Sequence, residues 1–473
     1  MNEMNQIQSL FEEFTGEKVA GVTELPSSGS NRRYFRVKGD TRTLIAVKGT
    51  CREENVAFYT LADHFRSKGL NVPQVYTHSD DFLFYLQEDL GNDILFDRLA
   101  AGREKGEYSA EEKALLIKTM RSLPSLQFKG AEGTDWSVCY PQPAFDGRMI
   151  SFDQNYFKYC FLKATGLEFS EIKLDEDFRT MSSILLRTMS DTFLYRDFQA
   201  RNVMLVNDEP FFIDFQGGRK GPIYYDVASF VWQAKANYSE ELKKEMLEAY
   251  LDALSEYMTV DRDEFFATLR HFVLFRTLQV LGAYGFRGYF EKKPHFLQSV
   301  PYAMANLKHL LAEPFEEYPY LTRVLRQLTE MRELTEVRTG ILEVQVCSFA
   351  YKKGIPNDMS GNGGGYVFDC RALENPGKYE HYKHFTGLDK EVIEFMEKEG
   401  GVFKFMDNVY ALADAHVQRY IERKFTHLMF CFGCTGGQHR SVYCAQHLAE
   451  HIARKFPVKV KLYHREQEIE QDL

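Results

Sequence analysis

The sequence predicts a bilobal α+β fold followed by a separate α/β domain with a largely parallel sheet. Three observations lead to this prediction: a length of 473 residues, a change from strand-like to mostly helical patterns near residue 92, and a regular alternation of strands and helices after residue 342. One hydrophobic core rarely serves a chain of this length, so two or more domains are expected. We expect a small lobe over 1–91, a large lobe over 92–338 and a further domain over 342–465.

The small lobe is predicted from its strand-like runs. Residues 33–37 and 43–47 are rich in β-branched and aromatic side chains, and 53–68 has the spacing of apolar residues found in helices. The large lobe shows long helical patterns, above all at 240–257 and 318–336, with one strand, turn and strand at 203–213.

The C-terminal segment alternates the two kinds of pattern. Its strands are expected at 342–349, 366–370, 427–432 and 458–463, and its helices at 390–399, 409–424 and 441–455. This order is typical of an α/β sandwich with a largely parallel sheet.

Composition limits the functional classes. Hydrophobic residues make up 44% and charged residues 27%, as in globular proteins, and the net charge of −10 argues against a general binder of nucleic acid or membranes. No signal-like or membrane-spanning apolar run is found, so we expect a cytoplasmic protein. Its eight cysteines are interpreted as reduced thiols. Cys431 and Cys434 form one Cys-x2-Cys pair without a second pair, so no zinc is expected.

The strongest chemical signal lies around the predicted hairpin at 203–213. Asp197 and Asn202 precede it and Asp214 follows it. Phosphoryl transfer needs a carboxylate to orient the attacking hydroxyl, and an amide and a second carboxylate to hold Mg²⁺ against the phosphates. Isolated Asp and Asn residues usually cap turns. Two polar clusters bracketing a hairpin favour the chemical interpretation, with Asp197 as the base and Asn202 and Asp214 as metal ligands.

A basic residue of the small lobe should complete such a site. Lys48 ends the run at 43–47 and would hold the α and β phosphates of ATP, although a surface lysine at a strand end is the plainer interpretation. Glu54, or else Glu53, would pair with Lys48 from the start of the following helix. The spacing does not decide between them.

Two further segments would contact the nucleotide in a protein-kinase-like fold of this kind. Ser30 and Asn31 lie in a loop where small residues let backbone N–H groups approach phosphate oxygens, which is a weak signal. Glu88 lies where the two lobes join, so its backbone could meet the adenine edge. A plain interlobe loop is an equally good description.

These motifs together resemble the aminoglycoside phosphotransferase and choline kinase superfamily over residues 1 to about 335. The resemblance is carried by 29–36, 196–202, 213–216 and 221–229. Within the superfamily the chain is similar to bacterial kinases of the anomeric hydroxyl of N-acetylmuramate and N-acetylglucosamine. That resemblance implies ATP, Mg²⁺ and an amino-sugar acceptor. Tyr195 stands where the family often has His, and Asp226 has the family's structural role of bracing the catalytic loop.

A second constellation lies at a predicted turn from strand to helix in the C-terminal domain. Backbone N–H groups at a helix start, with an arginine nearby and glycines that allow close approach, form an anion site more often than an empty turn. The expected residues are Cys434, Thr435, Gly436, Gly437, His439, Arg440 and Ser441.

A cysteine phosphatase is the competing interpretation of the same turn. Cys434 and Arg440 have the Cys-x5-Arg spacing in which a thiol of lowered pKa provides the nucleophile. Gly433 stands where those enzymes usually have His, and only Asp369 or Asp389 could be suggested as the general acid.

Residues 342 to about 465 resemble the C-terminal domain of the RNase adapter protein RapZ. The resemblance is carried by 348–356, 367–371, 386–389, 433–442 and 464–465. Such domains bind an amino-sugar phosphate, and some bind small RNA. Gln438 replaces the family's Lys, and the family's N-terminal P-loop does not occur in the chain. From residue 341 onward 17 Lys and Arg face 18 Asp and Glu, so RNA binding stays open but is not favoured. A regulatory adapter with an inactive kinase part is a further alternative.

Overall fold

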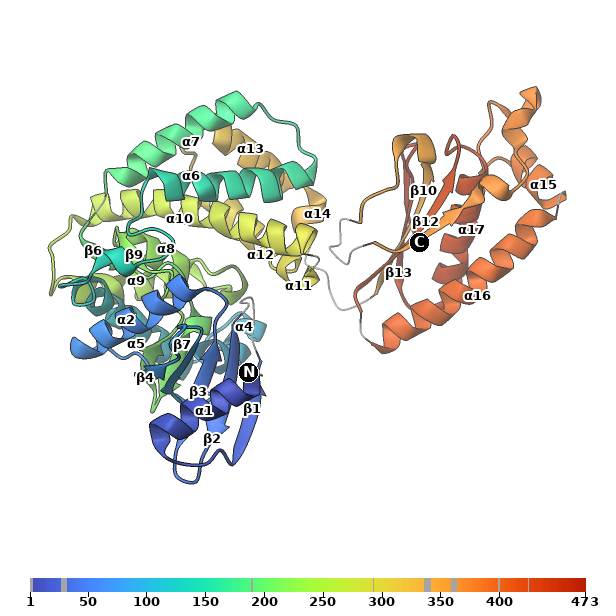
Figure 1. Ribbon diagram of the computed structural model, residues 1–473. Coiled ribbons are helices and arrows are strands. Elements are labelled where there is room, and N and C mark those ends of the chain that lie inside the picture. Colours follow the sequence, from blue (N-terminus) through green and yellow to red (C-terminus); the bar gives the residue numbers. More distant parts are fainter. Residues whose placement is uncertain are drawn as a thin grey trace. The chain divides into compact units, whose positions relative to one another are not determined.

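The protein is described by a computed structural model. The structure describes residues 3–26, 32–188, 190–291, 293–335, 342–358, 364–398, 400–423 and 425–473. It divides the chain into two compact units (Figure 1). The first unit comprises Met1–Ala283 and Tyr302–Met331, and the second comprises Tyr284–Pro301 and Arg332–Leu473. Each unit is described separately.

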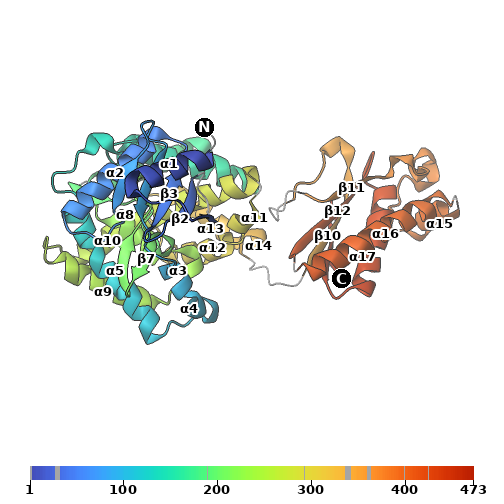
Figure 2. The ribbon, with the colours of Figure 1, turned by 60° about the horizontal axis from the view of Figure 1, so that its bottom comes forward.

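The N-terminal part of the first unit contains a five-stranded antiparallel sheet with strand order β1-β2-β3-β5-β4. Two of these strands, β2 and β3, are labelled in Figure 2. Its strands are β1 (Gly21–Leu25), β2 (Arg33–Lys38), β3 (Thr43–Lys48), β4 (Val75–His78) and β5 (Phe84–Glu88). The predicted runs at 33–37 and 43–47 are β2 and β3. Strands rich in Val, Ile, Tyr and Phe form here because both faces of the sheet are buried.

Two helices pack on opposite faces of this sheet. On α1 (Glu3–Thr15), Ile7 and Phe11 pack against Leu44 and Ala46 of β3. On α2 (Arg52–Ser67), a phenyl ring packs on β5, with 5.4 Å between the ring centroids of Phe58 and Tyr85. Successive side chains of a strand point to opposite faces, so every second residue of β3 faces α1 and the others face α2.

The rest of the first unit is mostly helical and contains two short antiparallel strand pairs. The hairpin of β7 (Val203–Val206) and β8 (Glu209–Phe212) lies in the chain between the paired strands β6 (Thr192–Leu194) and β9 (Arg219–Gly221). The helices are α3 (Leu95–Arg98), α4 (Ala100–Lys105), α5 (Ala110–Phe128), α6 (Gly147–Tyr156), α7 (Glu171–Leu186), α8 (Tyr224–Val231), α9 (Glu240–Leu254), α10 (Arg262–Gly285), α12 (Val300–Leu310) and α13 (Pro319–Glu330).

Serine caps define where the long helices of this lobe begin. Ser109 accepts a hydrogen bond from the N–H of Glu112, whose side chain in turn accepts from the N–H of Ser109, so α5 starts with a capping box. Ser170 and Ser239 cap α7 and α9 in the simpler way. No helix in the described ranges combines the length and the apolar character needed to cross a membrane.

The second unit contains a five-stranded sheet with strand order β11-β12-β10-β13-β14. The strands are β10 (Glu343–Ala350), β11 (Tyr366–Asp369), β12 (His427–Cys434), β13 (Lys459–His464) and β14 (Ile469–Asp472). The first four are parallel, and β14 is antiparallel to β13. This arrangement confirms the predicted fold class of a largely parallel sheet.

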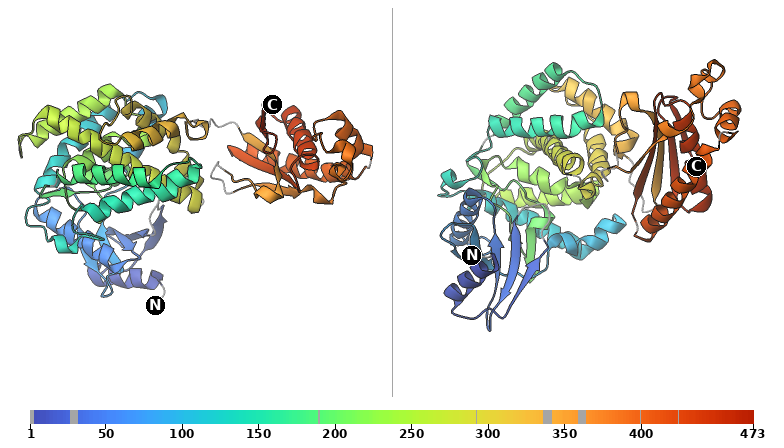
Figure 3. Two further views of the ribbon diagram at one scale, coloured as in Figure 1. Left: turned by 90° about the horizontal axis from the view of Figure 1, so that it is seen from above. Right: turned by 45° about the vertical axis from the view of Figure 1, so that its right-hand side comes forward.

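The helices of the second unit are α11 (Pro294–Leu297), α14 (Arg332–Thr335), α15 (Lys390–Lys398), α16 (Gly401–Glu422) and α17 (Arg440–Lys455). The core lies between one face of the sheet and α16 and α17 (Figures 1 and 3). Val346, Phe430 and Leu462 of three strands pack there with Val409 of α16 and Leu448 of α17. Because the four strands are parallel, their carboxyl ends meet at one edge of the sheet, where ligands of such sheets usually bind.

Candidate functional sites

The loop between β6 and β7 is held by a buried carboxylate. Asp226 of α8 is fully buried and accepts hydrogen bonds from the backbone N–H groups of Tyr195 (2.7 Å) and Arg196 (3.0 Å). Burial raises the pKa of Asp226 to about 7, although the two N–H donors act in the opposite direction. The Tyr195 hydroxyl donates to the carbonyl of Ile213. The loop that contains Asp197 is therefore fixed from both sides.

Asp197 keeps its carboxylate open to a ligand. Its side chain is 49% exposed, and Oδ1 lies 3.8 Å from Nη2 of Arg276. Arg276, from α10, is itself held by Ser229, whose Oγ accepts from Nε at 3.1 Å. A half-exposed carboxylate next to a fixed guanidinium has a defined orientation and remains free to accept a proton.

Asn202 and Asp214 lie at the two ends of the β7–β8 hairpin. The side-chain amide of Asn202 donates to the carbonyl of Asp197 (2.8 Å), and the N–H of Ile213 donates to the carbonyl of Asn202 (3.0 Å). Gln216 donates to Oδ1 of Asp214 at 2.6 Å. Loss of solvent contact raises the pKa of Asp214, and nearby Asp197 adds to this effect. The structure thus gathers the three residues that were predicted to act together.

Lys48 does not lie where the sequence interpretation expected it. It shares the α1 face of β3 with Leu44 and Ala46, and its Nζ forms an ion pair with Glu3 of α1 at 2.7 Å. The expected pair with Glu54 is therefore wrong. The physical reason is the alternation of side chains along β3, because α2, which carries Glu54, packs on the opposite face.

Arg32 occupies the position expected for that lysine. It lies two residues before Tyr34, which register places opposite Val47 on β3. Its guanidinium is 2% exposed and lies 3.3 Å from Glu54 and 3.8 Å from Asp214. Burial raises the pKa of Tyr34 to about 12, with Asp214 as the next cause, which places Tyr34 near the same carboxylate. The sequence contained one signal for this role. Arg32 and Tyr34 are two residues apart, so in an extended segment their side chains point to the same face.

The remaining predicted nucleotide contacts are Ser30, Asn31 and Glu88. Ser30 and Asn31 lie outside the described residues. Glu88 ends β5, where its N–H donates to the carbonyl of Gln74 (2.8 Å) and its carboxylate accepts from the N–H of Gln74 (3.1 Å). Arg66 approaches the same carboxylate at 3.8 Å. The side chain of Glu88 thus fixes the segment before β4, and an adenine contact of its backbone stays a prediction.

The donor set suits a magnesium ion shared with phosphates. The side-chain nitrogen of Asn202 donates to the backbone carbonyl of Asp197, which leaves the side-chain oxygen of Asn202 for a metal ion. Oδ1 of Asp214 accepts from Gln216, which leaves Oδ2 for the same ion. Mg²⁺ prefers such oxygen ligands and commonly takes one or two from the protein and the rest from phosphates and water. In the described part of the chain, no cluster of three or more His, Cys, Asp or Glu side chains could hold a metal alone.

The predicted anion loop of the second unit runs from the end of β12 to the start of α17. Sγ of Cys434 accepts from the N–H of Gly437 at 3.1 Å and lies 3.2 Å from Oγ of Ser441. Cys434 is buried, which disfavours the thiolate, but the hydrogen bonds from Ser441 and Gly437 lower its pKa overall. Thr435 and Gly436 are exposed at the tip of the loop.

Two basic side chains of this loop contact backbone carbonyls of neighbouring segments. Nη1 of Arg440 donates to the carbonyls of Arg371 (2.9 Å) and Leu373 (3.0 Å), beyond the end of β11. Nε2 of His439 lies 2.9 Å from the carbonyl of Tyr382, and burial lowers the pKa of His439. Arg440 thus positions the loop against the end of β11.

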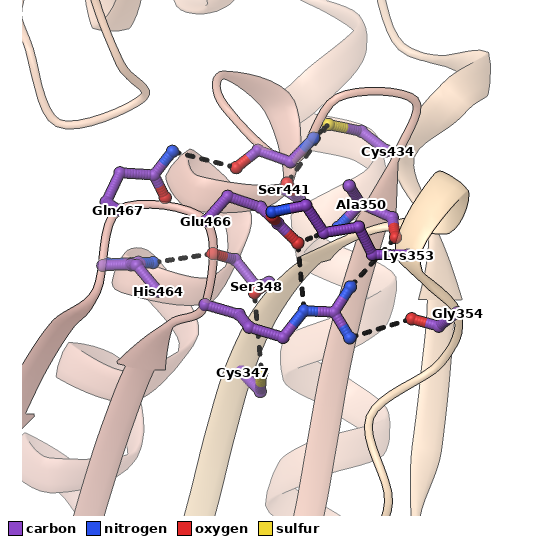
Figure 4. Close-up of polar contacts among 12 residues, drawn as sticks. Cys347, Ser348, Ala350, Lys353, Gly354, Cys434, Ser441, His464, Glu466 and Gln467 are labelled. Carbon is purple, nitrogen blue, oxygen red and sulfur yellow. Dashed lines mark hydrogen bonds and ion pairs between the residues drawn. The ribbon is translucent and has the colours of Figure 1, made fainter.

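A polar network that the sequence interpretation missed adjoins the loop (Figure 4). Glu466 is nearly buried and binds the N–H of Ala350 (3.1 Å), Nζ of Lys353 (2.6 Å) and Nε of Arg465 (2.9 Å). Gln467 donates to the carbonyl of Gly437 at 3.1 Å. Strands β10, β12 and β13 are neighbours in the sheet, so segments far apart in sequence meet at this edge.

The two acids suggested for a phosphatase are committed elsewhere. Asp369 forms an ion pair with Arg371 at 2.6 Å, and this interaction lowers its pKa. Asp389 accepts from the N–H of Thr386 at 2.6 Å and so fixes a turn. Both carboxylates thus have other partners in the structure.

The comparisons with known proteins fall into three groups. A model of the phosphotransferase enzyme family matches residues 21–263, and a model of the RapZ C-terminal domain matches residues 342–468. Among curated proteins, a nucleotide-binding protein of Petrotoga mobilis is 40% identical over 125 residues, which is 26% of this chain and 42% of that protein. One of Xanthomonas campestris pv. campestris strain B100 is 36% identical over 121 residues, which is 26% and 41%. The chain thus spans about two fifths of the length of these relatives.

Solved structures were also found. A thermostable mutant of the aminoglycoside phosphotransferase APH(4)-Ia has a TM-score of 0.43 at 13% identity, covering 64% of this chain and 98% of that one. The choline kinase LicA from Streptococcus pneumoniae has a TM-score of 0.43 at 11% identity, covering 66% and 100%.

The phosphotransferase match covers slightly more than half of the 473 residues and includes Asp197, Asn202 and Asp214. The second match covers residues 342–468 and includes strands β10 to β13 of the second unit, whereas β14 follows it. The chain therefore belongs to the phosphotransferase enzyme family, and its enzyme domain is followed by a RapZ C-terminal domain.

Proposed function

We propose that the first unit is an ATP-dependent kinase that phosphorylates a hydroxyl group of a small acceptor, in particular an amino sugar of the N-acetylmuramate or N-acetylglucosamine type. The observation that carries this proposal is the cluster of Asp197, Asn202 and Asp214 around one hairpin, with Arg32 beside Asp214. The family match supports the reaction type.

Each residue then has a defined task. Asp197 accepts the proton of the acceptor hydroxyl, and Arg276 keeps its carboxylate oriented. Asn202 and Asp214 would hold Mg²⁺, which when bound neutralises phosphate charge. The guanidinium of Arg32, kept in place by Glu54, would contact the phosphates as a planar donor of several N–H groups.

The choice of an amino sugar has a different basis. It is supported by the resemblance of the segments 29–36 and 196–202 to anomeric amino-sugar kinases, and by the RapZ C-terminal domain in the same chain. Both features point to amino-sugar metabolism, including the recycling of cell-wall material.

The acceptor is found by a panel assay of the full chain. ADP release with ATP and Mg²⁺ is measured for N-acetylmuramate, N-acetylglucosamine, glucosamine and an aminoglycoside, with Asp197→Asn as the inactive control. Amino-sugar-dependent release that the variant loses is the expected result. Release that is independent of any acceptor, or equal in the variant, would refute the kinase assignment.

For the second unit, we propose binding of an amino-sugar phosphate or a similar anion at the edge formed by Cys434–Ser441 and Glu466. The N–H groups at the start of α17 and the exposed backbone of Gly436 supply donors for a phosphate. Lys353 is exposed next to Glu466 and could reach a bound anion. RNA binding is the alternative, and the near-neutral charge of this domain does not favour it.

Calorimetric titration tests this second site. We expect glucosamine 6-phosphate to bind, unphosphorylated glucosamine to bind at least tenfold more weakly, and Ser441→Ala to weaken the binding of glucosamine 6-phosphate. The exposed Arg419 of α16 provides a matched control, since Arg419→Gln should leave binding unchanged. Equal affinity for both sugars would exclude an anion site, and a short RNA that binds more tightly than either sugar would support the alternative.

Phosphatase chemistry is a second candidate for this loop, because the thiol of Cys434 accepts hydrogen bonds in the way a thiolate nucleophile requires. Hydrolysis of p-nitrophenyl phosphate that is lost in Cys434→Ser would support it. No hydrolysis by the wild-type chain would remove it.

A further inference from the structure

Three arginines and a tyrosine form a cluster next to Asp197, and the proposed transfer step uses only one of them. Arg196 forms a two-pronged ion pair with Asp153, with both N–O distances 2.8 Å. The guanidinium carbons of Arg196 and Arg276 lie 5.3 and 5.8 Å from the ring centroid of Tyr225. The cluster therefore leads from the proposed catalytic base into the interior of the large lobe.

The hydroxyl of Tyr225 is the first unexplained group. Tyr225, on α8, is fully buried, and within the described ranges its hydroxyl has no hydrogen-bond partner. An unsatisfied buried hydroxyl destabilises the folded state, so phenylalanine would serve a purely structural role better.

Arg219 carries the second unexplained group. It lies on β9 and is 2% exposed. Its Nε and Nη2 both bind the carbonyl of Gly217, at 3.1 and 2.7 Å, whereas Nη1 has no hydrogen-bond partner in the part of the chain that the structure describes. Burial, followed by the charge of Arg196, lowers the pKa of Arg219 to about 10. Arg219 is therefore a positively charged side chain at a position where burial and the neighbouring charge of Arg196 disfavour a positive charge.

The structural explanation of Arg219 is a brace for the turn after Asp214. That role explains the two bonds to Gly217 but needs neither the charge nor the third nitrogen. Arg196 is neutralised by Asp153, and Arg276 lies near Asp197, but among the described residues no carboxylate lies within 4.0 Å of Arg219. A positive charge and two donors without acceptors are thus left in one region.

We propose that Arg219 and Tyr225 bind a carboxylate of the acceptor, so that the kinase prefers an acceptor with a carboxylate side arm over the corresponding neutral sugar. This inference rests on the proposed kinase function and adds the substrate class. A carboxylate presents two acceptor oxygens, one for Nη1 of Arg219 and one for the Tyr225 hydroxyl. It would also supply the missing negative charge.

The acceptor would have to reach this region past an irregular segment. Residues 139–144 lie outside helices and strands, and the segment is joined to β9 by a bond from the N–H of Lys220 to the carbonyl of Pro143 (3.0 Å). The guanidinium of Arg219 opposes the rise that burial causes in the pKa of Cys139, which places the start of this segment near Arg219. Because this segment has no helix or strand of its own, we place the entry of the acceptor there.

The test compares acceptors that differ in the carboxylate alone. N-acetylmuramate, its methyl ester and N-acetylglucosamine are offered to the full chain with ATP and Mg²⁺, and kcat/KM is measured for each. We expect the carboxylate form to be preferred over the ester by about 10- to 100-fold, as a charge-assisted hydrogen bond would give. In Arg219→Gln this ratio should fall below about threefold, while Arg179→Gln, at an exposed ion pair on α7, should retain it.

Tyr225→Phe separates binding from folding. If the hydroxyl awaits a ligand, the variant should unfold at an equal or higher temperature than the wild type without acceptor, and should lose part of the preference for the carboxylate form. A lower unfolding temperature with an unchanged preference would assign Tyr225 to the fold and contradict the proposal.

These outcomes distinguish failure of the kinase assignment from failure of the carboxylate site. No phosphorylation of any sugar would refute the proposed function itself. Phosphorylation with equal kcat/KM for the acid and the ester would leave the kinase assignment intact and refute the carboxylate site.

Discussion

Arg32 lies with its guanidinium 3.3 Å from the carboxylate of Glu54, and this contact links the start of β2 to α2. The same guanidinium lies 3.8 Å from Asp214 at the end of the β7–β8 hairpin. One buried cation therefore connects the front sheet, the helix behind it and the proposed metal ligand. Lys48, on the other face of the sheet, is paired with Glu3 and takes no part in this arrangement.

Replacement of Arg32 or Lys48 by methionine should affect catalysis to very different extents. In Arg32→Met the proposed phosphate contact is lost, so kcat/KM for ATP should fall about 100-fold or more, as removal of one electrostatic contact to the transition state typically does. Lys48→Met should change it less than about threefold. Steady-state kinetics with varied ATP checks both variants.

Circular dichroism controls for folding in this comparison, since Arg32 also pairs with Glu54. Glu54→Gln offers an independent check, because it should lower activity only through the position of Arg32, and by less than Arg32→Met. A larger loss in Lys48→Met than in Arg32→Met would reverse the assignment.

Asp226 should make the stability of the first unit depend on pH. Its pKa is about 7 in the folded chain and about 3.9 in an unfolded one, so between these values the folded state binds the proton more tightly. The free energy of unfolding should therefore fall as the pH rises from 4 to 7, by about 4 kcal/mol at most. Asp226→Asn should lack this dependence.

Urea unfolding between pH 4.5 and 7.5 measures this effect. Both tryptophans of the chain, Trp136 and Trp232, belong to the first unit, so their fluorescence reports on that unit alone. As the pH rises, the wild type should lose stability relative to Asp226→Asn. Parallel pH profiles would show that Asp226 titrates normally.

The sequence predicted the residues of the phosphotransfer site that lie close together in the chain. Asp197, Asn202 and Asp214 flank one hairpin, so local patterns were sufficient to group them. The role of Lys48 could not be predicted in this way, because its orientation depends on which face of the sheet α1 covers. That packing is set by Ile7 and Phe11, some forty residues upstream.

Both local and non-local features explain the other differences. The helix predicted over 318–336 ends at Glu330, because Met331 adopts an extended conformation before the short α14. The helix predicted over 409–424 begins at Gly401, after Gly400 with φ of +71°. Glu466 joins the anion loop only through the strand order of the sheet, which no local pattern contains.

Cys434 should react as an activated thiol. Hydrogen bonds from Ser441 and Gly437 lower its pKa, so the pH profile of its alkylation by iodoacetamide should have a midpoint below 9, the ordinary value for a thiol. In Ser441→Ala one donor is lost and the midpoint should move to higher pH. Peptide mass spectrometry measures each cysteine separately.

Cys139 gives the reference within the same samples. Burial raises its pKa to about 11, so its midpoint should lie above that of Cys434 and should not respond to Ser441→Ala. Identical midpoints for Cys434 in the wild type and the variant would show that Ser441 does not stabilise the thiolate.

The central claim is that Arg32, Asn202 and Asp214 surround one metal-bound triphosphate next to Asp197. Crystals grown with a non-hydrolysable ATP analogue and Mn²⁺ in place of Mg²⁺ test it directly, because Mn²⁺ is located by its anomalous scattering. We predict a peak within coordinating distance of the side-chain oxygens of Asn202 and Asp214, with the guanidinium of Arg32 hydrogen-bonded to a phosphate oxygen. A peak away from these two residues, or phosphates bound by Lys48, would contradict the account.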